Sequence, residues 1–65
     1  MKIKIWEARD RAGVSLKELS RRTGVSDGAL WNYENGRRSP TLETLEKIAE
    51  ALNISISDLY DSDYK

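Results

Sequence analysis

The side-chain chemistry available to this 65-residue chain is narrow. Cysteine and histidine are both absent, which excludes disulfides, thiolate metal sites and imidazole catalysis. The carboxylates, lysines and hydroxyls that remain do not assemble into a nucleophile with its base, a metal-ligand set or a phosphate-binding glycine loop. We therefore expect no enzymatic activity, no cofactor and no small-molecule ligand.

The chain does offer groups that suit nucleic acid, and they are concentrated in one short stretch. Asp27 can accept a hydrogen bond from the amino group of cytosine, and Asn32 can either pair with adenine through two hydrogen bonds or bind a phosphate. Arg37 and Arg38 are adjacent cations that suit phosphate oxygens, with solvated loop surface as the competing explanation. An aromatic contact is also available, since the indole of Trp31 is expected either to fold back onto a neighbour or to contact a ligand.

Charge is divided unevenly along the chain, although the formal net charge is zero. Residues 1–38 carry nine Lys and Arg against five Asp and Glu, whereas residues 39–65 carry two against six. A basic first half favours contact with DNA phosphates, and an acidic second half would face away from DNA or toward another protein. Simple solvation of charged helix faces is the alternative explanation.

Two short helices joined by a tight turn are predicted to position these groups. Ser15 can cap the first helix, and Glu18 completes an S-x-x-E capping box. Gly24 can adopt a positive φ just past its end, and Ser26 can cap the second helix over residues 27–35. This arrangement is typical of a helix-turn-helix. The apolar positions expected to face the interior are Leu19, Val25, Leu30 and Tyr33.

Helices are also expected on both sides of this unit. Before it, residues 4–12 predict a helix that ends at Gly13 and whose packing shields Trp6. Residues 1–4 fit either an extra helical turn or an extended arm. After it, Pro40 and Thr41 begin an amphipathic helix that ends near Asn53. Its expected apolar stripe is Leu42, Leu45, Ile48, Ala49 and Leu52.

Ser55 and Asp58 repeat the capping pattern and predict a short fifth helix. Together the elements predict an all-α fold, a compact bundle of five short helices that forms one domain over residues 1–60. A frayed, polar tail is expected over residues 61–65. No apolar run approaches the roughly 18 residues of a membrane span and no export signal is apparent, so we expect a cytoplasmic location.

An ordered set of motifs extends over most of the chain: G-V-S-x-x-E-L-S-x-x-T-G-V-S-x-x-x-L-x-x-Y-E-N-G-R-R-x-P, followed by T-L-E-T-L-E-K-I-A-E-A-L-N-I-S-I-S-D-L. Through these motifs, from Ile5 to Tyr60, the chain resembles the Cro and phage-repressor family of helix-turn-helix domains, also called the Xre family. The resemblance implies a lambda-repressor-like DNA-binding domain. In such domains the second and third helices form the helix-turn-helix, and the third enters the major groove.

The resemblance also implies two sets of DNA contacts. The base-reading set is Ser26, Asp27, Gly28 and Asn32, with Trp31 beside them. The phosphate-binding set is Ser15, Leu16, Lys17, Asn35, Arg37 and Arg38. The family commonly has glutamine where this chain has Leu16, and leucine can offer only its backbone N–H. Gly28 could let the backbone approach a base closely, or could be drift at a tolerant position.

Two further features are expected from the resemblance. The first is a structural ion pair between Arg9 and Glu34, partly buried, that fixes the first helix against the end of the third. The second is a two-fold dimer contact that would place two recognition helices about 34 Å apart on palindromic DNA. The residues expected at that contact are Ile54, Ile56, Leu59 and Tyr60.

These patterns favour one function over its alternative. The chain is predicted to be a sequence-specific transcriptional regulator, a repressor that binds double-stranded DNA as a homodimer and acts by occupancy. The alternative is a protein-interaction module on the same scaffold, such as an antitoxin or an anti-repressor partner. Dependence of binding on salt and on the arginine pair Arg37 and Arg38 would distinguish the two.

Overall fold

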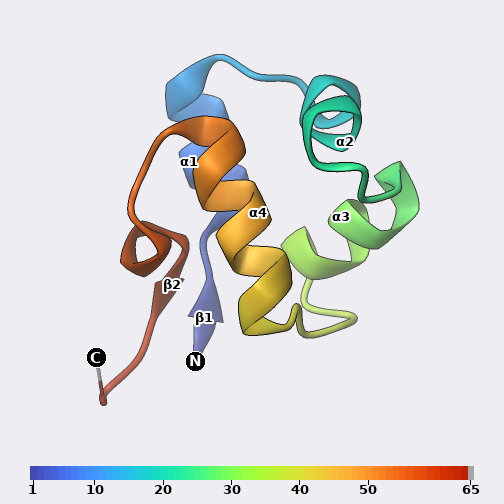
Figure 1. The fold of residues 1–65 in the computed structure, drawn as a ribbon. Coiled ribbons are helices and arrows are strands. Elements are labelled where there is room, and N and C mark those ends of the chain that lie inside the picture. Colours follow the sequence, from blue (N-terminus) through green and yellow to red (C-terminus); the bar gives the residue numbers. More distant parts are fainter. Residues whose placement is uncertain (65) are drawn as a thin grey trace.

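The fold consists of four α-helices and a short antiparallel strand pair within residues 1–64, the part of the chain that this computed structural model describes (Figure 1). The elements, in chain order, are β1 (Lys2–Ile3), α1 (Ile5–Ala12), α2 (Leu16–Thr23), α3 (Asp27–Glu34), α4 (Leu42–Leu52), the 3-10 turn η1 (Ile56–Leu59) and β2 (Tyr60–Asp61). Helices α2 and α3 form the predicted helix-turn-helix, and α4 lies against both α1 and α2.

Side-chain caps begin α2 and α3 as the sequence predicts. The Oγ atom of Ser15 accepts from the N–H of Glu18 at 3.0 Å, and that of Ser26 accepts from the N–H of Ala29 at 3.1 Å. These bonds satisfy backbone donors that a helix start otherwise leaves unpaired. Gly24 ends α2 with a φ of 75°, and its N–H donates to the carbonyl of Ser20 at 2.9 Å. The reversal between α2 and α3 is therefore fixed locally.

The prediction of a purely helical bundle with five helices was wrong at the chain ends. The segment after Ser55 closes only a 3-10 turn, in which the N–H of Asp58 donates to the carbonyl of Ser55 at 3.0 Å. It has no room for a longer helix, because Tyr60 is already extended with φ −155° and ψ 155°.

Residues 2–3 take the extended one of the two conformations considered for the N-terminus. β1 pairs antiparallel with β2, Lys2 opposite Asp61 and Ile3 opposite Tyr60. Asp61 thus belongs to a strand and not to the predicted tail. Fraying of the residues after it stays a prediction, and Lys65 lies outside the described residues.

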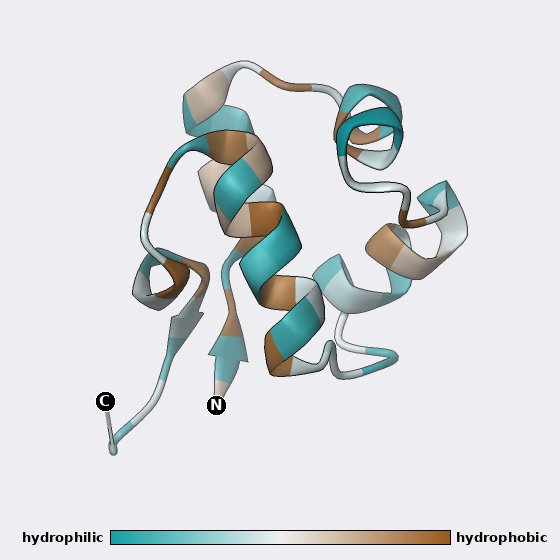
Figure 2. Cartoon of the chain, in the orientation of Figure 1, coloured by the Kyte–Doolittle hydropathy of each residue, from teal (hydrophilic) through white to brown (hydrophobic). Residues whose placement is uncertain are grey.

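The core lies where the four helices and η1 meet. Its fully buried large side chains are Ile5, Leu19, Leu30, Leu45, Ile48 and Leu59. α4 alternates hydrophobic and hydrophilic residues along its length, as an amphipathic helix should (Figure 2). Within this helix the predicted stripe fails only at Leu42, which is 71% exposed because the first turn extends beyond the core.

Trp6 also departs from expectation. We expected the packing of the first helix to shield it, but the side chain is 52% exposed. The reason is helical spacing: Ile5 and Ala8 are the buried residues of α1, and Trp6 lies off their face. Both tryptophans of the chain are therefore accessible to solvent.

Candidate nucleic-acid interface

The outer face of α3 carries the residues expected to read bases. Ser26, Asp27, Gly28 and Trp31 are exposed, whereas Asn32 is half-buried. A Cβ atom added to Gly28 would meet nothing within 4 Å, so internal packing does not require glycine there. The face is open to a partner along the length of the helix.

The start of α2 lies beside the start of α3. Ser15, Lys17 and Asp27 contribute to one surface hollow of about 480 Å³ between the two helices. Lys17 is exposed, whereas Leu16 is half-buried and packs against the hydrophobic core. Leu16 therefore has an internal role in addition to its backbone N–H, which explains why an apolar residue is tolerated where the family commonly has glutamine.

Hydroxyl groups fix the turn that sets α3 against α2. The Oγ atom of Ser20 donates to the carbonyl of Val25 at 2.6 Å. The Oγ1 atom of Thr23 donates to the carbonyl of Leu19 at 2.8 Å and accepts from the N–H of Val25 at 3.1 Å. Our reading of the sequence missed these contacts, although Ser and Thr beside a predicted turn are the residues that make such bonds.

The loop after α3 is tied back to the helix. Gly36 has a φ of 71°, and its N–H donates to the carbonyl of Tyr33 at 3.3 Å. The N–H of Arg37 donates to the carbonyl of Asn32 at 2.9 Å, which completes a Schellman motif. The Nδ2 atom of Asn35 donates to the carbonyl of Trp31 at 2.8 Å, so one of its donors already serves the helix end. The backbone that carries the two arginines is therefore ordered.

Arg37 stacks on Trp31. Its Cζ atom lies 5.2 Å from the centre of the indole ring, within the range of a cation–π contact. The indole nevertheless keeps 45% of its surface exposed, so it has both a neighbour and a free side. The two roles considered for Trp31, packing on a neighbour and contact with a ligand, are thus compatible.

An ion pair joins α1 to the end of α3. The Nε atom of Arg9 donates to Oε2 of Glu34 at 2.9 Å, and Nη2 donates to Oε1 at 3.3 Å. The Nη1 atom of Arg9 also donates to the carbonyl of Val14 at 3.0 Å. The side chains are 16% and 6% exposed, respectively. The expected pair is present and partly buried, and its two parallel bonds fix the orientation of α3.

The arginines late in α2 are occupied within the protein. Arg21 and Arg22 both bind the carboxylate of Glu18, through Nε donors at 3.0 Å and 2.8 Å. Arg22 also donates through Nη1 to the carbonyl of Ala51 in α4 at 3.2 Å. The carboxylate of Glu18 therefore accepts hydrogen bonds from these arginines. The predicted capping box would instead have it accept from the backbone N–H of Ser15.

These contacts predict an acid dependence of stability. Hydrogen bonds from Arg21 and Arg22 lower the pKa of Glu18 from its ordinary value of 4.5 to about 2. Because the folded state favours the carboxylate, the contribution is present above pH 4.5 and is lost as the pH falls toward 2. Thermal melts of wild type and Glu18→Gln should converge over this interval. A difference that stays constant with pH would contradict the assignment.

The residues expected at a dimer contact do not all reach the surface. Ile54, Ile56 and Tyr60 are half-buried, but Leu59 is completely buried and is corrected here to a core residue. Ile54 borders a hollow of about 380 Å³ between the ends of α1 and α4. That hollow also includes Ala8, Arg11, Ala12, Leu52 and Asp58.

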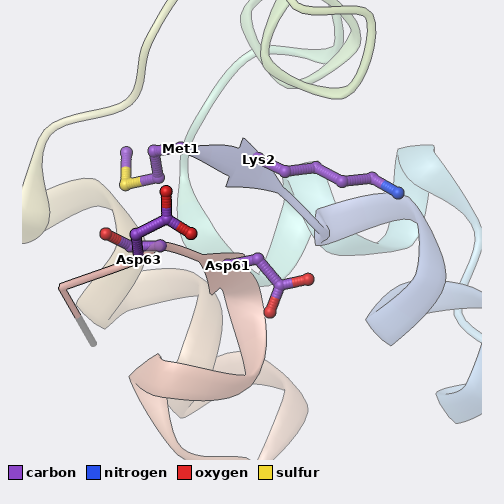
Figure 3. Close-up of a pocket in the computed structure, with 5 residues that line it drawn as sticks. Met1, Lys2, Asp61 and Asp63 are labelled. Carbon is purple, nitrogen blue, oxygen red and sulfur yellow. The ribbon is translucent and has the colours of Figure 1, made fainter.

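A third hollow lies at the open end of the strand pair (Figure 3). Asp61 and Asp63 lie there with Met1, while the side chain of Lys2 extends away toward α1, where it pairs with Glu7 at 3.9 Å. The carboxylates disfavour phosphate at this end of the molecule. Residues 1–64 contain no cluster of three or more acidic, Cys or His side chains that could hold a metal ion, and none of their helices is long and apolar enough to cross a membrane.

Comparison with known proteins gives consistent matches. A family model described as helix-turn-helix, HTH_3, matches residues 7–59. The chain is 42% identical over 56 residues to an uncharacterised HTH-type transcriptional regulator of Mycobacterium tuberculosis, covering 86% of this chain and 40% of that protein. It is 39% identical over 61 residues to the cryptic phage CTXphi transcriptional repressor RstR of Vibrio cholerae, covering 91% and 54%.

Among solved structures, the N-terminal DNA-binding domain of SinR from Bacillus subtilis superposes with a TM-score of 0.80. It is 30% identical, and the match covers 95% of this chain and 91% of that domain. By contrast, the chain spans only 40% of the length of the mycobacterial relative. The similarity therefore concerns one compact unit that recurs in proteins of different lengths.

Proposed function

This chain belongs to the helix-turn-helix family, and we propose that it is a DNA-binding transcriptional regulator, a repressor that inserts α3 into the major groove. Blocking a promoter by occupancy requires neither catalysis nor a cofactor. A regulator of this kind acts where DNA is accessible, and we propose the cytoplasm.

One observation carries the proposal: the exposed face of α3 has cations at both ends. Lys17 lies on the surface that the starts of α2 and α3 share, and Arg37 and Arg38 follow the end of α3. A helix in the major groove is flanked by a phosphate backbone on each side, so cations are needed at both of its ends. Ser15 and Leu16 add backbone N–H groups at the start of α2, where the helix dipole favours an anion.

The polar groups between these ends supply sequence readout. Asp27 is exposed at the first turn of α3 and suits the amino group of cytosine, while Asn32 suits adenine. Asn32 is half-buried, so its amide must reach the groove from a restricted position. Gly28 lies between them and has no side chain, so the backbone there can approach a base closely. Ser26 and Trp31 complete the proposed base-facing set.

We further propose a homodimer on a palindromic site. The hollow between α1 and α4 is lined by apolar side chains together with Arg11 and Asp58, which bear opposite charges. In a two-fold contact the Arg11 of one copy would face the Asp58 of the other, which makes the surface self-complementary. Ile54, Ile56 and Tyr60 lie in the same region of the chain and would extend it.

Titration with duplex DNA at two salt concentrations tests both proposals. We would follow the emission of Trp31 in a Trp6→Phe background, because Trp6 is exposed and would add a second signal. With three cationic contacts per copy, from Lys17, Arg37 and Arg38, raising salt from about 50 to about 200 mM should weaken a monomer about 40-fold and a dimer about 2000-fold.

The outcome separates the competing functions. A saturable change with one of these salt dependences supports a DNA-binding regulator, and its steepness reports whether one copy or two are bound. The alternative, a protein-interaction module on the same scaffold, predicts no binding of DNA even at low salt. That result would overturn the regulator proposal.

A further inference from the structure

Arg37 is held against α3 at two points. Its backbone N–H donates to the carbonyl of Asn32 at 2.9 Å, and its guanidinium lies 5.2 Å from the ring centre of Trp31. Trp31 is itself anchored in the last turns of α3, where its carbonyl accepts from Asn35. The backbone and the guanidinium of Arg37 are thus both held against the same helix.

The contacts of Arg37 differ from those of three other arginines of this domain. Arg9 is paired with Glu34, and Arg21 and Arg22 share Glu18, so each of these arginines already has a carboxylate partner. No carboxylate within residues 1–64 forms an ion pair with Arg37. The Cζ atom of Arg37 lies over the indole ring, and a guanidinium has five N–H donors, so the donors that do not face the ring stay available. Such an arrangement keeps the ligand-binding edge free while restricting the side chain.

We propose that Trp31 is a positioning residue, which holds the guanidinium of Arg37 in place to donate to a phosphate oxygen of the DNA backbone. The inference rests on the proposed DNA-binding function and deepens it. A free arginine side chain must be ordered when it binds, which lowers affinity, whereas a stacked one is ordered in advance. Trp31 then contributes to affinity through Arg37, even where the indole touches no base.

The expected size of this effect follows from the exposure of the stack. Cation–π contacts at exposed sites correspond to about a two- to fivefold change in an equilibrium constant. We therefore expect Trp31→Leu to weaken DNA binding about two- to fivefold when Arg37 is present, and to have little effect in an Arg37→Ala background. Arg38, the adjacent arginine, has no ring contact within residues 1–64 and supplies the matched control: Trp31→Leu should weaken binding equally in Arg38→Ala and in wild type.

A double-mutant cycle measures this coupling directly. The probes are two fluorescein-labelled 20-base-pair duplexes of unrelated mixed sequence, titrated by anisotropy at low salt, because a phosphate contact does not depend on base sequence. Circular dichroism melts establish that each variant is folded. Trp31→Phe, which keeps an aromatic face, provides a second substitution and should retain part of the coupling.

Each outcome is decisive. Coupling between Trp31 and Arg37 on both duplexes, without coupling to Arg38, supports the proposal. Independent effects of Trp31 and Arg37 would overturn it while DNA binding itself stands, and would mean that the indole acts separately. Coupling on one duplex only would show that Arg37 reads a base, which overturns the phosphate assignment. Absence of binding by the wild type would instead refute the proposed function, and the inference with it.

Discussion

Arg9→Ala is expected to lower the free energy of unfolding by about 3 kcal/mol, the lower end of the cost of breaking a buried ion pair. Glu34 is only 6% exposed, so its carboxylate would lose two guanidinium donors in a place where water replaces them poorly. The carbonyl of Val14 would lose its donor as well. The 16% exposure of Arg9 is the reason to expect the lower end of the range.

Thermal and urea unfolding, followed by circular dichroism, would measure this loss. In a domain of this size a change of about 3 kcal/mol lowers the melting temperature by roughly 12 to 24 °C. Glu34→Ala should cost less than Arg9→Ala, because the arginine it leaves behind keeps its bond to Val14.

The double variant Arg9→Leu/Glu34→Leu is the control. It leaves neither charge unpaired, so it should be more stable than Arg9→Ala. A loss below about 1 kcal/mol in Arg9→Ala, the range of exposed ion pairs, would show that solvent screens this pair.

Much of the fold could be predicted because its determinants are local. Ser15, Ser26 and Thr41 cap the helices that follow them, and Asn53 ends α4 with a φ of 55°. A cap depends on residues three or four positions away, which a sequence shows directly. The apolar spacing of α4 was equally visible, apart from Leu42 at its first turn.

The errors at the chain ends lie where distant parts of the chain meet. The pairing of β1 with β2 joins residues that are nearly the whole chain apart, and neither two-residue strand has a periodicity of its own. The N–H of Lys4 donates to the carbonyl of Leu59 at 2.8 Å, a contact that also draws Leu59 into the core and away from the expected dimer surface.

The candidate site shows the same division. The residue types on α3 were readable from the sequence, but the stack of Arg37 on Trp31 was not. It depends on Gly36, whose positive φ turns the chain so that Arg37 folds back toward the helix. The signal was present in the Gly-Arg pair after the helix, since a Schellman ending brings the residue after the glycine back over the last turn.

Arg37→Ala/Arg38→Ala is the second change with a large expected effect, in this case on DNA affinity. If each arginine contacts a phosphate, each contributes a factor of about 8 to the binding constant at 0.1 M salt. The double variant should then bind about 60-fold more weakly as a monomer, and about 4000-fold more weakly as a dimer that loses four contacts. Neither arginine forms an ion pair within residues 1–64, and the contact of Arg37 with Trp31 is exposed, so stability should change by no more than about 1 kcal/mol.

The salt dependence decides whether the loss arises from phosphate contacts. For a monomer the slope of log K against log salt should fall from about −2.7 to about −0.9, because two of three cationic contacts are removed. Lys4→Gln/Lys47→Gln removes the same charge outside the proposed interface and should leave the slope unchanged. If that control weakened binding as much as the arginine variant, general electrostatic attraction would explain the affinity. The two arginines at the end of α3 would then contribute no more to DNA affinity than other surface cations do.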